Sequence, residues 1–144
     1  LQDIKYADLT NIKIQEAKGR FEIVNDSPIK IIDGAHNYEG VEILLRNYEN
    51  KYGHLNTDLF LGFKKGKDIN NIFNLIIGKK NYNLHLIEDD TFFDQEITKE
   101  IGYLLDKNGK NYRISSLEQF NRNKNPSILL GSLYLIGEYK KREL

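Results

Sequence analysis

The chain has 144 residues, no net charge at neutral pH and no cysteine. Its length suits one domain with a sizeable core. The balanced charge argues against a basic face that binds nucleic acid, and the lack of cysteine excludes disulfides, thiolate metal sites and a cysteine nucleophile. No apolar stretch approaches the ~20 residues that cross a bilayer, and no signal peptide is visible. We therefore expect a cytoplasmic protein whose partners are neither nucleic acid nor a membrane.

The sequence begins at Leu1 and contains no methionine. Because a complete gene product begins with Met, we expect the chain to be a piece of a larger protein, the alternative being that the numbering omits the N-terminus. Residues 1–18 are predicted to form a short helix, from Ile4 to about Ile14, and a connector. Residues 19–144 are predicted to form one α/β domain.

Strands are predicted at six places after the connector. Phe21–Val24 alternates apolar and polar residues, as a half-buried strand does, and the apolar segment Ile29–Ile32 follows a short turn. That turn is too short to join parallel strands, so these two are expected to pair antiparallel at an edge of the sheet. The other predicted strands are Thr57–Leu61, Leu84–Ile87, Tyr112–Ile114 and Ser127–Leu130.

Helices are predicted between these strands from the spacing of apolar residues and from their start and stop signals. They cover residues 37–52, 68–77, 94–105, 116–121 and 133–139. Strands that alternate with helices imply right-handed crossovers and a mainly parallel sheet. The predicted fold is a three-layer α/β/α, Rossmann-like domain with a mostly parallel six-stranded sheet and one antiparallel edge strand.

The turn after Ile29–Ile32 contains two candidate functional residues, Asp33 and His36. Open α/β sheets bind their ligands at the carboxyl ends of the strands. Asp33 either tightens the loop as an Asx turn or accepts a hydrogen bond from a ligand hydroxyl. His36 is either a ligand contact or an exposed loop histidine. Asn37 is an N-cap for the next helix.

A similar strand-to-helix turn follows Ser127–Leu130, where Gly131 and Ser132 precede the last helix. Ser132 caps that helix, faces a ligand, or does both. It is a poor nucleophile candidate because the Gly-x-Ser-x-Gly elbow is missing. Arg20, at the head of the first strand, is either a surface residue or a phosphate ligand that binds through its planar set of donors.

Other motifs are better explained as structure or surface. His54 and His85 have no paired-histidine spacing, so no zinc site is expected. Gly62–Asp68 differs from a phosphate-binding loop, because only three residues separate its glycines and Asp68 replaces the Ser or Thr that binds magnesium. We therefore expect no triphosphate site within the chain itself. Two basic clusters are expected to be solvated surface: Lys64-Lys65 and Lys140-Lys141-Arg142.

Four segments that occur in a fixed order carry a resemblance to a known family. They are Gly19-Arg20-Phe21-Glu22, Ile32-Asp33-Gly34-Ala35-His36-Asn37, Leu61-Gly62-Phe63 with Lys67-Asp68-Ile69, and Gly131-Ser132-Leu133-Tyr134-Leu135-Ile136-Gly137-Glu138. From about Ile4 to Glu138, the chain resembles the C-terminal domain of folylpolyglutamate synthase and dihydrofolate synthase, a branch of the Mur ligase superfamily. It departs from the family pattern at Lys18, at Tyr38 and at Thr91–Asp94.

The resemblance implies an ATP-dependent amide ligase with ATP and Mg²⁺ as cofactors and folate and L-glutamate as substrates. ATP phosphorylates a folate carboxylate, and the amine of L-glutamate attacks the acyl phosphate. In such enzymes the N-terminal domain holds the phosphate loop and most magnesium ligands, and the C-terminal domain closes the cleft. The isolated chain is therefore expected to be inactive, to need its own N-terminal domain as a partner, and to be monomeric.

The resemblance also implies roles for individual residues. Arg20 would reach the ATP phosphates and Asp33 the nucleotide ribose. His36 would lie beside the reacting centre as the catalytic residue and contact the incoming glutamate. Ser132 would help to hold that glutamate, and the Lys67-Asp68 pair would flank the cleft.

One other interpretation remains open, and a third is disfavoured. The chain could instead be a stand-alone Rossmann-like module that binds a small ligand without catalysis. A hydrolase that uses Asp33 and His36 is disfavoured, because the sequence offers neither a nucleophile nor a set of metal ligands.

Overall fold

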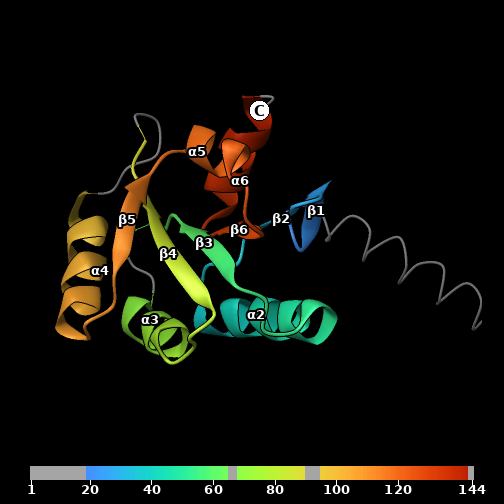
Figure 1. Ribbon diagram of the computed structural model, residues 1–144. Helices are drawn as coiled ribbons and strands as arrows, with labels where there is room; N and C mark the ends of the chain where they lie inside the picture. Colours follow the sequence, from blue (N-terminus) through green and yellow to red (C-terminus); the bar gives the residue numbers. More distant parts are fainter. Residues whose placement is uncertain (1–18, 65–67, 90–94, 143–144) are drawn as a thin grey trace, which may run out of the picture.

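The computed structural model describes residues 19–64, 68–89 and 95–142 (Figure 1). The strands are β1 (Glu22–Asp26), β2 (Ile29–Asp33), β3 (Thr57–Leu61), β4 (Tyr82–Ile87), β5 (Tyr112–Ser115) and β6 (Ser127–Leu130). The helices are α2 (Tyr38–Tyr52), α3 (Ile69–Ile77), α4 (Gln95–Lys107), α5 (Leu117–Arg122) and α6 (Leu133–Lys141). The helix expected at Ile4–Ile14, Lys67 and Thr91–Asp94 lie outside the described residues.

The strands form one sheet in the order β1-β2-β6-β3-β4-β5. β1 pairs antiparallel with β2, and its register shifts between Ile23 and Asn25. The other four pairings are parallel. The predicted fold class, including the single antiparallel edge strand, is confirmed.

Each face of the sheet has its own hydrophobic core, because successive residues of a strand point to opposite faces. Ile31 packs in the core beneath α2, α3 and α4, whereas its neighbour Ile32 packs in the core beneath α5 and α6. Figure 1 shows the two groups of helices on opposite sides of the sheet. Both positions are fully buried, so β2 needs apolar residues on both faces, as interior parallel strands do.

The topology identifies one place at the sheet where a crevice is expected. The chain leaves β2 and β3 toward helices on one face, but it leaves the intervening β6 toward α6 on the other face. The turns therefore diverge at the carboxyl ends of these three neighbouring strands. Open α/β sheets bind ligands at such a point. None of the described helices is both long and apolar enough to pass through a membrane.

Candidate functional site

Three turns meet at the carboxyl edge of the sheet. In the strand registers, Asp33 of β2 lies opposite Leu130 of β6, and Leu130 lies opposite Leu61 of β3. The turns that follow these strands therefore begin side by side. The structure thus brings Asp33 and Ser132 to the same edge, as their sequence positions had suggested.

The Asp33 carboxylate holds two pieces of backbone at this edge. Its Oδ1 atom accepts a hydrogen bond from Ala35 N–H at 2.8 Å, and its Oδ2 atom accepts one from Phe21 N–H at 2.9 Å. Only 5% of the residue is exposed. Burial raises the pKa of Asp33, and the opposing effects of the two backbone hydrogen bonds and of Arg20 do not cancel this rise. Asp33 is therefore an Asx-turn residue, and each oxygen keeps a further acceptor position.

Two glycines allow the turns to approach one another closely. Gly131 has a φ of +123°, and a Cβ atom there would lie 2.4 Å from the Gly62 carbonyl oxygen. A Cβ atom on Gly34 would lie 2.3 Å from Leu133 Cδ2. A side chain at Gly131 would collide with backbone, which cannot move aside as a flexible side chain can. The turns after β3 and β6 are therefore in direct backbone contact.

Capping side chains begin two of the helices that leave this edge, α2 and α6. Asn37 Oδ1 accepts from Gly40 N–H at 2.8 Å, and Ser132 Oγ accepts from Tyr134 N–H at 3.1 Å. Ser132 is 6% exposed. Because its oxygen accepts a hydrogen bond at the helix end, its own O–H remains a donor. The predicted capping roles of both residues are confirmed.

The His36 ring is fixed by a neighbouring backbone group. Its Nδ1 atom lies 2.9 Å from the Gly34 carbonyl oxygen. A carbonyl only accepts, so Nδ1 carries the proton, and Nε2 of the neutral ring is an acceptor. The residue is half-buried, so it is neither a core histidine nor a freely moving surface one.

Basic residues flank the three turns. Arg20 is exposed, and its charge acts on Asp33. Lys64 Nζ lies 3.9 Å from the centre of the Tyr134 ring, a cation–π contact. Sequence reasoning placed Lys64 in a solvated cluster and gave Tyr134 no role. A usable signal was present, because both residues closely follow the carboxyl end of a strand.

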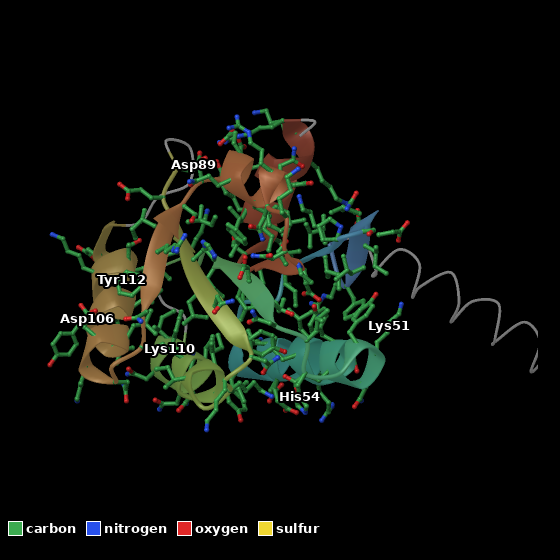
Figure 2. The ribbon with its side chains drawn as sticks, viewed as in Figure 1. Lys51, His54, Asp89, Asp106, Lys110 and Tyr112 are labelled. Carbon is green, nitrogen blue, oxygen red and sulfur yellow. The ribbon has the colours of Figure 1, made fainter. Side chains whose placement is uncertain are left out.

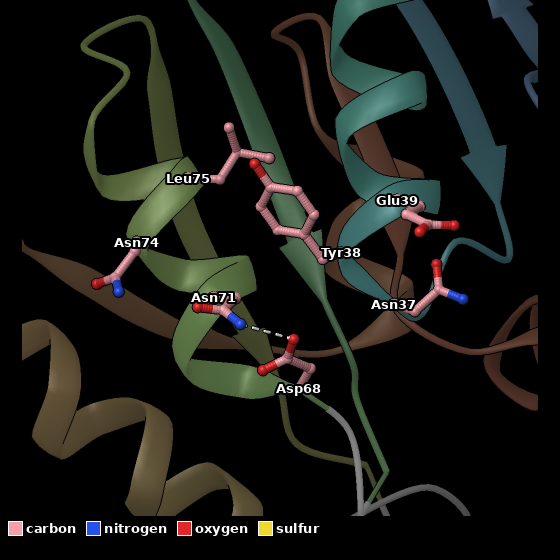
Figure 3. A pocket seen from close by; sticks show the side chains of 7 residues that line it. All are labelled: Asn37, Tyr38, Glu39, Asp68, Asn71, Asn74 and Leu75. Atoms are coloured by element: carbon pink, nitrogen blue, oxygen red, sulfur yellow. Dashed lines mark hydrogen bonds between the residues drawn. The ribbon is translucent and has the colours of Figure 1, made fainter.

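A groove adjoins the turns, between the N-terminal end of α2 and one side of α3 (Figure 3). It has a volume of about 760 Å³. Figure 3 shows the Tyr38 ring lying across the gap, with its hydroxyl end toward Leu75. Asp68 accepts a hydrogen bond from Asn71 at 2.9 Å. The lining residues are Asn37, Tyr38, Glu39, Asp68, Asn71, Asn74 and Leu75.

The groove therefore offers amides, carboxylates and an aromatic ring to a polar ligand. Asp68 lines this groove, and its place beside a ligase cleft stays a prediction. Its sequence partner Lys67 lies outside the described residues. Among residues 19–64, 68–89 and 95–142, no group of three His, Asp or Glu side chains is arranged to hold a metal ion.

The other two histidines have the positions that sequence reasoning gave them. His85 stacks on Phe60 with ring centres 4.2 Å apart, and its Nδ1 atom lies 2.9 Å from Ser115 Oγ. His54 is exposed in the turn between α2 and β3. Neither residue lies in the three turns at the carboxyl edge.

Comparison with known proteins finds relatives by structure alone. No protein-family model matches the sequence, and no curated protein matches it. A solved structure of folylpolyglutamate synthase from Thermotoga maritima shares the fold with a TM-score of 0.70 and 23% identity, over 85% of this chain and 30% of that chain. A bifunctional folylpolyglutamate synthase/dihydrofolate synthase from Yersinia pestis, complexed with AMPPNP and Mn ion, has a TM-score of 0.65 and 19% identity, over 88% and 31%.

A structure of E. coli FolC in complex with DHPP and ADP gives a TM-score of 0.62 and 20% identity, over 88% of this chain and 31% of that one. The chain thus spans less than a third of the length of the proteins it matches. At such identities the likeness establishes the fold. That fold is one found in folylpolyglutamate synthases, as the resemblance of the sequence had indicated.

Proposed function

We propose that this chain is the C-terminal domain of a folylpolyglutamate synthase, an ATP-dependent amide ligase that adds L-glutamate to folates. One observation carries the proposal: three turns that bear the family-like segments converge at one edge of a sheet whose fold occurs in such synthases. The structural matches that cover nearly all of this chain, but about 30% of the solved synthases, support its being one domain of a larger enzyme.

In the proposed reaction, ATP phosphorylates the terminal carboxylate of a folate. The amine of L-glutamate then attacks the acyl carbon, the new amide forms, and ADP and phosphate leave. Several anionic groups must meet, so cationic and hydrogen-bonding groups are needed where charge develops. A second domain that closes over the cleft supplies such groups and keeps water away from the acyl phosphate.

The carboxyl edge offers suitable groups for these tasks. The exposed Arg20 has the planar donors that suit a phosphate. The unused acceptor positions of Asp33 suit a ribose hydroxyl. The Ser132 O–H suits a carboxylate of glutamate. The His36 Nε2 acceptor suits the attacking amine, from which a proton must be removed.

ATP and Mg²⁺ need groups that the described residues lack. No phosphate loop is present in the sequence, and the described residues hold no cluster of metal ligands. In this proposal the N-terminal domain holds Mg²⁺ and the triphosphate, and this chain contributes only the groups named above. The 144-residue chain on its own should therefore not ligate glutamate.

The test is an assay of the protein encoded by the whole gene. It should add L-glutamate to tetrahydrofolate in the presence of ATP, and replacement of tetrahydrofolate by dihydropteroate measures a dihydrofolate synthase activity. His36→Ala and Asp33→Asn should each lower turnover by about 100-fold, with Arg46→Gln as an exposed control. Wild-type rates in both variants would remove the site assignment, and ligation by the 144-residue chain would contradict the domain assignment.

The alternative is a stand-alone Rossmann-like module that binds a small ligand. The two proposals differ in what the gene encodes before Leu1. A Gly-x-x-Gly-Lys-Ser/Thr loop upstream supports the ligase. A coding sequence that starts near Leu1 supports the binding module.

A further inference from the structure

A second cavity lies at the opposite edge of the sheet, near the starts of β3, β4 and β5. Its volume is about 640 Å³. Figure 2 shows Lys110 at this amino edge, whereas Asp89, which follows β4, lies at the other end of the sheet. Its polar and charged lining residues include Asp58, Asn83, Lys110, Arg113, Asn123 and Asn125.

One wall of the cavity is built around a buried carboxylate. Asp58 is 4% exposed. Its Oδ1 atom accepts from the Asn83 amide at 3.0 Å, and its Oδ2 atom accepts from the Asn123 and Asn125 amides at 2.9 and 3.2 Å. Apart from His85, whose Nε2 atom lies 3.8 Å away, no basic group of the described residues is within ion-pair distance.

This arrangement leaves hydrogen-bond acceptors in excess. Each of the three asparagines uses its amide N–H₂ group on Asp58. Across the part of the chain that the structure describes, none of their three side-chain oxygens receives a hydrogen bond. All three residues line the cavity together with Asp58. This wall therefore suits a positively charged ligand group with several hydrogen-bond donors.

The other wall is cationic. Arg113 lies beside His85 in the pairing of β5 with β4, and Lys110 precedes β5. Within residues 19–64, 68–89 and 95–142, neither side chain makes an ion pair. A guanidinium binds a carboxylate through two parallel hydrogen bonds. This wall therefore suits an anionic group of a ligand.

We propose that this amino-edge cavity binds an amino acid as a zwitterion. The ammonium group of the amino acid lies against Asp58 and the asparagine oxygens, and the carboxylate of the amino acid lies against Arg113 and Lys110. An ammonium has three donors and no acceptor, which matches the first wall. β3 and β5 are two strand spacings apart, roughly 10 Å, a gap that a small amino acid and two long basic side chains fill. The site is separate from the carboxyl edge and does not depend on the proposed ligase activity.

The test is a titration of the ¹⁵N-labelled 144-residue chain, followed by NMR. Glycine and L-glutamate are the probes, with methylammonium and acetate as the two half-ligands. The expected result is saturable shifts of the signals of Asp58, His85 and Arg113, with binding at least about tenfold tighter for an amino acid than for either half-ligand. No saturable shift, or equal binding of one half-ligand, overturns the proposal.

Substitutions test which wall binds each end of the amino acid. Arg113→Gln and Asp58→Asn should each weaken glycine binding by about tenfold, and Arg46→Gln, on the exposed face of α2, should leave it unchanged. If Asp58→Asn does not fold, the proposed binding is tested with Arg113→Gln and Lys110→Gln instead. Unchanged binding in the Arg113→Gln, Lys110→Gln double variant overturns the proposal, because the carboxylate would then have no partner on this wall.

Discussion

The two edges of the sheet are held together in different ways. At the amino edge, charged side chains join separate elements: Glu49 accepts hydrogen bonds from Lys79 and Tyr82, and Lys30 donates to the Asn121 carbonyl. At the carboxyl edge, glycine backbones touch and short side chains cap helices. Small residues allow the three turns to approach one another without filling the space at the carboxyl edge of the sheet. These amino-edge contacts thus contribute stability through charge, and the three turns after β2, β3 and β6 contribute it through close approach. The carboxyl end of β4 also has ion pairs, in which Arg142 contacts Asp89, Glu118 and Glu138.

The largest effect expected from this difference is that of Gly131→Ala. The new Cβ atom would lie 2.4 Å from the Gly62 carbonyl oxygen, at a backbone φ of +123°. Overpacking and backbone strain together should cost roughly 3–5 kcal/mol of unfolding free energy. Urea unfolding measures this loss.

Gly109 at the amino edge is the matched control for Gly131. Its φ is +65°, but nothing lies within 4 Å of a Cβ atom built there. Gly109→Ala should therefore cost only the left-handed strain, about 1–2 kcal/mol. Equal losses in the two variants would show that close approach does not hold the carboxyl edge together.

Charge at the amino edge is probed by Glu49→Ala. The variant leaves Lys79 and the Tyr82 hydroxyl without their carboxylate, which accepts from them at 2.9 and 2.7 Å. The expected loss is about 2 kcal/mol at pH 7. Glu42→Ala is the control on the same helix, because among the described residues Glu42 pairs only with the largely exposed Arg46. It should cost less than about 1 kcal/mol.

The pH dependence of stability sharpens this prediction. Burial raises the pKa of Glu49, but the hydrogen bonds from Tyr82 and Lys79, together with the charges of Lys79 and His54, outweigh burial, so its pKa lies below the usual 4.5. The stabilisation by Glu49 is thus complete above that value and is lost as the pH falls through the lower folded-state pKa. The difference in stability between wild type and Glu49→Ala should shrink below pH 4.5, and a constant difference would contradict this account.

Asp33 at the carboxyl edge should show the opposite pH dependence. Burial raises its pKa above 3.8, so its ionised form costs stability at neutral pH, and that cost disappears as the pH falls through the raised pKa. Asp33→Asn removes the buried charge but turns an N–H₂ group toward one backbone N–H. The net loss should be about 1 kcal/mol at pH 7, and wild type should gain relative to the variant on acidification. Denaturant unfolding between pH 7 and pH 4 measures both quantities.

The sequence predicted the fold well because its signals are local. The apolar segments that became β2, β3 and β6 are bounded by turn residues, and Asn37 and Ser132 are the N-caps they were expected to be. The position of Asp33 beside the turn after β6 followed from topology. Its two backbone hydrogen bonds did not, because the short turn predicts that β1 pairs with β2 but not the register of that pairing, which shifts between Ile23 and Asn25 and determines that Phe21 N–H reaches Asp33.

The contacts that sequence reasoning missed are those between distant segments. The approach of Lys64 to Tyr134 requires β3 and β6 to be neighbours, and the sheet order β2-β6-β3 is not encoded in either segment alone. The amino-edge cavity was missed for the same reason. Asp58 and Asn123 are far apart in sequence, and neither has a local pattern that predicts their hydrogen bond. The two residues come together because β6 lies beside β3.

The smallest effect on stability is expected from His36→Ala. The ring is half-buried, and in the described part of the chain its one hydrogen bond is to a carbonyl in its own turn. Its loss should change the unfolding free energy by less than about 0.5 kcal/mol, as measured by urea unfolding of the 144-residue chain. Such a small effect would support the proposal that His36 contacts a ligand rather than stabilising the fold. A loss above 1.5 kcal/mol would instead make His36 part of the framework, and a fall in turnover of the same variant would then report on folding rather than on the site.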